Sequence, residues 1–161
     1  MFLNYVIENK EIVVHGSNHS SINIFKPRKS TLFNGKPINA VFASSDGVWS
    51  LFFAVQNREG YVGSIRNLCL SITTKKGIKR YYYFSINNKE EPNCWTNGTI
   101  YFFWKSDFRH GGIKNEWVSE KEITPPAKLN VSPIDFPLLQ KVMNHKETDS
   151  TMKTILKALF T

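Results

Sequence analysis

The chain of 161 residues carries a formal net charge of +8, and 41% of its residues are hydrophobic, 14% aromatic and 21% charged. This length suits one domain with a substantial core, so we expect a single domain over residues 1–161. The basic balance favours nucleotide, nucleic-acid or acidic protein partners. The sequence contains neither a long apolar run nor a signal-peptide pattern, which predicts a cytoplasmic protein without membrane contact. We also expect a monomer.

The first half of the chain predicts a strand, a loop, a second strand and a helix. Residues 12–15 are apolar and end in a histidine, and residues 20–37 contain the turn-forming residues of a surface loop. Residues 38–44 are rich in apolar and small side chains, which predicts another strand. Ser45 and Asp46 then precede apolar residues at helical spacing, so we expect a helix capped at this point.

The second half predicts mainly strands. Residues 68–74 and 78–86 flank a Lys-Lys-Gly turn and predict a hairpin. Residues 98–104, 116–119 and 129–131 indicate further strands, and residues 134–144 and 150–160 have helical periodicity. We therefore expect an α+β domain with a bent or split mixed or antiparallel sheet, ending in a helical segment over residues 134–161.

Three short motifs carry the functional signal. His15-Gly16-Ser17 ends the first strand, Val41-Phe42-Ala43-Ser44 ends the second, and Glu116 begins a late strand. In this order they resemble the ADP-ribosyltransferase-like fold, in the group with a His-Gly-Ser strand end, a Tyr-Phe-Ala strand and a late glutamate. The chain also resembles small uncharacterised bacterial proteins with the same motifs.

This resemblance implies NAD binding and, if the chain is an enzyme, transfer of ADP-ribose or hydrolysis of NAD. It implies His15 and Glu116 as catalytic residues, contacting ribose hydroxyl groups. A carboxylate in that place stabilises the positive charge that develops on the sugar when its glycosidic bond breaks.

The cofactor-binding residues implied by the resemblance come from four places. They are Gly16, whose backbone would hold the nicotinamide carboxamide; Ser17; Ser44 or Ser50, which would bond the same amide; and Arg28 or Lys29, which would neutralise the pyrophosphate. For each of these residues an ordinary structural role is the alternative: a strand-end hydrogen bond, a turn or helix cap, or a solvated charge.

One departure from the family pattern concerns the second motif. Val41 stands where the family has tyrosine, so this position supplies no ring to stack on nicotinamide. The alternative function is a non-enzymatic module that binds a nucleotide or an acidic protein on the same scaffold. A third possibility is a nucleic-acid binder, whose affinity would fall steeply with salt. The histidines and cysteines lack metal-ligand spacing, so we expect no metal.

Overall fold

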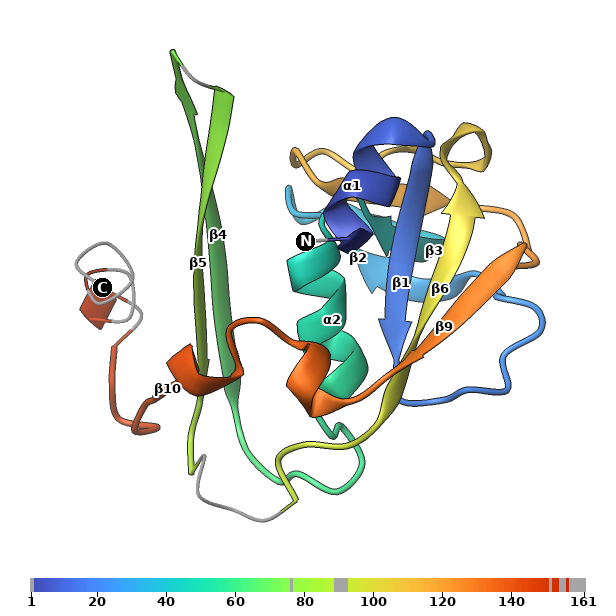
Figure 1. Ribbon diagram of the computed structural model, residues 1–161. Coiled ribbons are helices and arrows are strands. Elements are labelled where there is room, and N and C mark those ends of the chain that lie inside the picture. Colours follow the sequence, from blue (N-terminus) through green and yellow to red (C-terminus); the bar gives the residue numbers. More distant parts are fainter. Residues whose placement is uncertain (1, 76, 89–92, 151, 154–155, 157–161) are drawn as a thin grey trace. The chain divides into compact units, whose positions relative to one another are not determined.

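The computed structural model describes residues 2–75, 77–88, 93–150, 152–153 and 156 (Figure 1). Contacts within the chain define two compact units. Unit 1 comprises residues 1–57 and 95–137, and unit 2 comprises residues 58–94 and 138–161. The chain combines α-helices with mainly antiparallel strands, which confirms the predicted α+β class. One domain over residues 1–161 stays a prediction.

Unit 1 contains α1 (Phe2–Asn9), α2 (Gly47–Val55) and a seven-stranded sheet within its described residues. The strands run in the order β7-β8-β3-β1-β6-β9, and β2 pairs with β3 off this path. Their bounds are β1 (Ile12–Ser17), β2 (Arg28–Thr31), β3 (Pro37–Ser44), β6 (Gly98–Trp104), β7 (Arg109–His110), β8 (Glu116–Ser119) and β9 (Ala127–Val131).

The core of unit 1 lies on both sides of this sheet. On one side, buried rings from the loop at Phe25 and from Tyr101 and Phe103 of β6 pack with Val13 of β1 and Val41 of β3. On the other side, α2 packs against β1 and β6. Most residues of α2 are apolar, as expected for a helix that is buried on most of its surface.

The expected helix cap at residues 45–46 is confirmed. Asp46 is the N-cap of α2, and its carboxylate accepts hydrogen bonds from the backbone N–H groups of Val48 and Trp49 at 3.0 and 3.1 Å. These bonds satisfy two of the helix's unpaired donors. The side chain of Asn4 in α1 accepts a further hydrogen bond from the N–H of Gly47 at 2.9 Å.

Unit 2 is built on the predicted hairpin. Strands β4 (Ile65–Thr74) and β5 (Gly77–Ile86) pair antiparallel over their full length, and β10 (Met143–Asn144) pairs parallel with the end of β5. The hairpin is drawn in green in Figure 1. On one face of this sheet Arg66 of β4 and Met143 of β10 flank Ser85 of β5.

Two expectations about elements were wrong. The expected loop at residues 20–37 contains the strand β2, which pairs with Pro37–Ala40 of β3. Residues 134–144 form two short 3-10 helices (Pro133–Asp135 and Leu139–Lys141) and β10 in place of an α-helix. Pro137 interrupts this segment, because proline lacks the N–H that an α-helix requires and disfavours helical backbone in the preceding residue.

Of the second expected helix, at residues 150–160, most residues lie outside those described. Of the residues that the structure describes, no helix is both long and apolar enough to cross a membrane.

Candidate functional site

Gly16 lies directly beneath α2. A Cβ atom at this position would come within 2.0 Å of the Ser50 carbonyl oxygen and 2.8 Å of the Ala54 nitrogen. The strand and the helix therefore approach more closely here than any side chain allows. Because alternate residues of a strand share a face, Val14 and Gly16 both lie on the side of the sheet that α2 covers, which we call the helix face.

The helix face also carries Ser44 and Glu116. Val14 of β1 lies opposite Ser44 of β3, and Ser44 lies opposite Glu116 of β8. Residues directly opposite each other in an antiparallel pair project to the same side. The structure thus brings four predicted site residues to one face: Gly16, Ser44, Glu116 and, on α2 itself, the buried Ser50.

The Glu116 carboxylate is partly buried against the loop that precedes it. Its Oε1 atom is buried and has no hydrogen-bond partner among the described residues. It lies against the main chain of Gly111, where a Cβ would be 2.5 Å from Oε1. Burial raises the pKa of Glu116 above its ordinary value, and the charge of His110 partly opposes this rise. A buried, unpaired carboxylate oxygen with a raised pKa is typical of functional sites.

The loop that precedes Glu116 folds back on it. The N–H of Gly111 donates to the Glu116 carbonyl oxygen at 2.8 Å, and the N–H of Glu116 donates to the Ile113 carbonyl oxygen at 3.0 Å. His110 packs edge-on against Trp117, with ring centroids 5.6 Å apart. The carboxylate is therefore positioned by its own loop.

His15 occupies the seam between β1 and β3. It follows Val14, so its side chain starts from the face opposite α2, and its ring contacts Phe25 at 5.1 Å between centroids. Its Nδ1 atom lies 2.8 Å from the Phe42 carbonyl oxygen in β3. Because a carbonyl only accepts, Nδ1 must carry a proton and donate it. The imidazole thus links the two strands just beyond the Val14–Ser44 pair.

The remaining predicted residues have local roles. Ser17 accepts a hydrogen bond from the N–H of His19 at 3.1 Å, and the Ser44 hydroxyl accepts one from the N–H of Asp46 at 3.0 Å. Arg28 is exposed on β2, opposite Ala40 of β3. By strand alternation His15 and Ser17 start from the face opposite the helix face, so the structure does not bring His15 and Glu116 to one face. Arg28 shares the side of Ala40 and Ser44 but lies on β2, opposite a residue four positions before Ser44.

A polar junction ties the start of α2 to the strand of Glu116. The N–H of Ser45 donates to the Asn115 carbonyl oxygen at 3.1 Å, and the Asn115 amide nitrogen lies 3.5 Å from the second carboxylate oxygen of Asp46. Asp46 is only 1% exposed. Because Asn115 directly precedes Glu116, the helix cap and the carboxylate are positioned by the same contacts.

Two aromatic residues of α2 escaped the sequence analysis as site candidates. Trp49 and Phe53 are half-buried, and their ring centroids lie 5.7 Å apart. They flank Ser50 in sequence, with Phe53 three residues after it and so on the same side of the helix. The helical periodicity of this segment rests on Val48, Leu51, Phe52 and Val55, and no sequence signal other than proximity to Ser50 would have identified Trp49 and Phe53.

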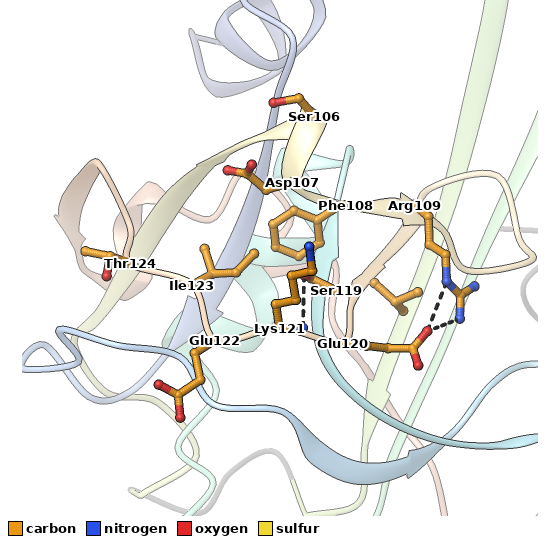
Figure 2. Close-up of a pocket in the computed structure, with 11 residues that line it drawn as sticks. Ser106, Asp107, Phe108, Arg109, Ser119, Glu120, Lys121, Glu122, Ile123 and Thr124 are labelled. Atoms are coloured by element: carbon orange, nitrogen blue, oxygen red, sulfur yellow. Dashed lines mark hydrogen bonds and ion pairs between the residues drawn. The ribbon is translucent and has the colours of Figure 1, made fainter.

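Two hollows open on the surface of unit 1. One, of about 570 Å³, is lined by residues 106–109 and 118–124 and contains the Arg109–Glu120 ion pair at 2.6 Å (Figure 2). It adjoins the far end of β8, away from Glu116. The other, of about 480 Å³, lies where β1 and β9 end and β6 begins, and its lining residues include Asn18, Asn97 and Asn130.

Comparisons of the chain with protein-family models, with curated proteins and with solved structures return no match. What this chain does must therefore be inferred from its own residues. In the part of the chain that the structure describes, no group of three or more His, Cys, Asp or Glu side chains is placed to hold a metal ion.

Proposed function

We propose that the chain binds NAD and transfers its ADP-ribose group to an acceptor or to water. The observation that supports this most is the Glu116 carboxylate, which keeps a buried, unbonded oxygen on the same face as Gly16, Ser44 and Ser50. Burying a carboxylate oxygen without a partner costs free energy. A ligand hydroxyl or a developing positive charge at this place would offset that cost.

The chemistry follows from the charge that the reaction creates. The bond between the ribose C1′ and the nicotinamide nitrogen breaks, and its electron pair leaves with nicotinamide. The sugar becomes oxocarbenium-like, and a nearby carboxylate stabilises it more than it stabilises intact NAD. An acceptor hydroxyl, amine or water oxygen then bonds to C1′ and loses a proton. Glu116 must be ionised to act in this way.

The polar surroundings of the β1 end fit the rest of a nucleotide. His15 holds β1 and β3 together through the Phe42 carbonyl oxygen, with its ring on the face opposite α2. The hollow of about 480 Å³ begins at Asn18, three residues after His15, and is lined by amide and hydroxyl groups that match ribose hydroxyls.

The position of Val41 explains why this strand carries no tyrosine there. Val41 is 4% exposed and belongs to the core on the face opposite α2, so a ring at this position would enlarge an already packed interior. Trp49 and Phe53 of α2 provide half-buried rings near Ser50 instead. We infer that one of them supplies the flat apolar surface for nicotinamide.

The experiment measures nicotinamide release and protein labelling with isotopically labelled NAD. The wild type should release nicotinamide or become labelled, and Glu116→Gln should lose at least about 10²-fold in rate, as expected when a transition-state contact is removed. Glu120→Gln is the matched control, because Glu120 is an exposed residue directly after β8 and should leave the rate unchanged. Equal rates in wild type and Glu116→Gln would exclude the proposed role of the carboxylate.

A second candidate function is a binding module without turnover, which Val41 favours because the usual stacking ring is absent from β3. NAD or ADP-ribose would then raise the melting temperature of the wild type without nicotinamide release, since a ligand selective for the folded state stabilises it.

Binding to a generic oligonucleotide that weakens steeply with salt, with no response to NAD, would favour the basic surface as a nucleic-acid site.

A further inference from the structure

Unit 2 contains a buried histidine between two serine hydroxyls. The Nε2 atom of His145 lies 2.8 Å from the Ser64 hydroxyl, and its Nδ1 atom lies 2.7 Å from the Ser85 hydroxyl. His145 is 3% exposed and Ser85 is fully buried, whereas Ser64 is half-buried and remains in reach of solvent. The hydroxyl of a half-buried serine thus contacts one nitrogen of the imidazole, and the hydroxyl of a fully buried serine contacts the other.

The sheet of unit 2 builds this arrangement. Met143 of β10 lies beside Ser85 of β5, and His145 continues the same strand direction, with its N–H donating to the Ile86 carbonyl oxygen at 3.3 Å. Residues 143 and 145 alternate with residue 144, so both project to the face that carries Ser85. Ser64 precedes β4 directly and shares this face with Arg66, which lies opposite Ser85.

Ser64 is fixed independently of the histidine. Its N–H donates to the Asn87 side-chain oxygen at 2.7 Å, and its carbonyl oxygen accepts from the Asn87 N–H at 3.2 Å. The Tyr61 hydroxyl also bonds to Asn87, and the Asn87 amide nitrogen donates to a carboxylate oxygen of Glu147 at 3.2 Å. The Ser64 hydroxyl is therefore held in one place relative to the imidazole.

A nucleophile within hydrogen-bond reach of a base that a third group orients is the arrangement by which serine is activated. In the tautomer with the proton on Nδ1, His145 donates to Ser85 and accepts from the Ser64 hydroxyl. We propose that Ser64 is an acyl-accepting nucleophile, with His145 as its general base and Ser85 as the residue that positions the ring. This site is separate from the NAD site proposed for unit 1.

The substrate class follows from the third residue. Ser85 is neutral, so it stabilises the imidazolium less than a carboxylate does, and a triad whose third member loses its charge is much slower. The site therefore suits activated esters with good leaving groups. The Ser64 Oγ bonds to the ester carbonyl carbon while its proton moves to His145 Nε2; the carbon–oxygen bond to the leaving group breaks, and the leaving group takes that proton. Water then releases the acid by the same steps.

The experiment uses the full chain with a fluorophosphonate probe and with p-nitrophenyl acetate. Peptide mapping by mass spectrometry should locate one fluorophosphonate adduct, on Ser64, formed with loss of fluoride. Ser64→Ala should remove it. His145→Asn keeps an amide donor toward Ser85 but loses the base, and should slow labelling by about 10²-fold or more. Ser85→Thr, which keeps the hydroxyl, should retain more of the rate than Ser85→Ala.

Two controls separate this site from general reactivity. Ser71→Ala changes a half-buried serine of β4, the strand that follows Ser64, and should leave the labelling rate as in the wild type. Glu116→Gln should also keep it, so that the two proposals fail or hold separately. Circular dichroism and thermal melts establish that each variant is folded. A folded wild type without an adduct on Ser64, or a folded His145→Asn variant that labels as fast as the wild type, would overturn the proposal.

Discussion

Gly16 and Ser50 are in direct contact through their main chains. A Cβ atom built on Gly16 would lie 2.0 Å from the Ser50 carbonyl oxygen. This oxygen belongs to the backbone of a helix, so it cannot move aside as the end of a flexible side chain could. This contact sets the separation between β1 and α2, and with it the shape of the helix face.

Gly16→Ala is therefore expected to destabilise unit 1. The added methyl group would push α2 away from β1, and overpacking of this kind costs about 1–3 kcal/mol or more. For a chain of this size each kcal/mol lowers the melting temperature by roughly 2–4 °C. Thermal melts would test this against Ser17→Ala, which changes the neighbouring residue on the opposite face. Equal melting temperatures for the two variants would contradict the contact.

Asp46→Ala should lower the free energy of unfolding by about 1–2 kcal/mol, because it leaves the Val48 and Trp49 N–H groups without their cap. Asp46→Asn keeps an acceptor oxygen at the same place and should recover most of this loss. Chemical denaturation of the three proteins would show the difference. If Asp46→Asn were as unstable as Asp46→Ala, the stabilisation by Asp46 would come from its negative charge rather than from its capping hydrogen bonds.

His15→Ala should cost about 1–3 kcal/mol, since it leaves the Phe42 carbonyl oxygen without its donor at the β1–β3 seam. It should also weaken the melting-temperature increase produced by NAD. His15→Asn offers an amide donor in place of Nδ1 and should restore stability more than it restores NAD binding. Recovery of both to the same extent would indicate that the imidazole has only a structural role.

The raised pKa of Glu116 predicts how stability depends on pH. The folded state binds the Glu116 proton more tightly than the unfolded state does. Protonation of Glu116 therefore adds to the free energy of unfolding. This contribution is complete below the ordinary pKa of about 4.5 and is lost as pH rises through the folded-state pKa. At pH 7 the buried charge is unfavourable. Glu116→Gln should thus melt at a higher temperature than the wild type at pH 7, with the difference vanishing near pH 4.

Thermal melts across this range would test the prediction, with Glu120→Gln as the exposed control. A Glu116→Gln variant that is less stable than the wild type at pH 7 would show that the carboxylate has a stabilising partner. Combined with loss of nicotinamide release in the same variant, a gain in stability would mark Glu116 as a residue whose placement favours activity over stability.

The sequence by itself determined the elements whose pattern is local. Apolar and aromatic runs predicted β1, β3 and β6, the runs on either side of a Lys-Lys-Gly turn predicted the β4–β5 hairpin, and Asp46 before an apolar helix predicted the cap of α2. The strand β2 carried no such pattern, because all four of its residues are exposed and only its pairing with β3 makes it a strand. Apolar residues in 134–144 recur at helical spacing, but Pro137 prevents an α-helix there.

Only the tertiary structure decided how the candidate residues are grouped. Alternation along a strand shows that His15 and Gly16 project to opposite faces, but it does not show which face a helix covers. The Val14–Ser44 and Ser44–Glu116 pairs place Glu116 with Gly16 on the helix face, over a separation of about a hundred residues. The Ser64–His145–Ser85 group depends likewise on the pairing of β10 with β5, which the two residues of β10 are too few to predict. Strand register is set by packing between distant segments, and it therefore decides which distant side chains share a site.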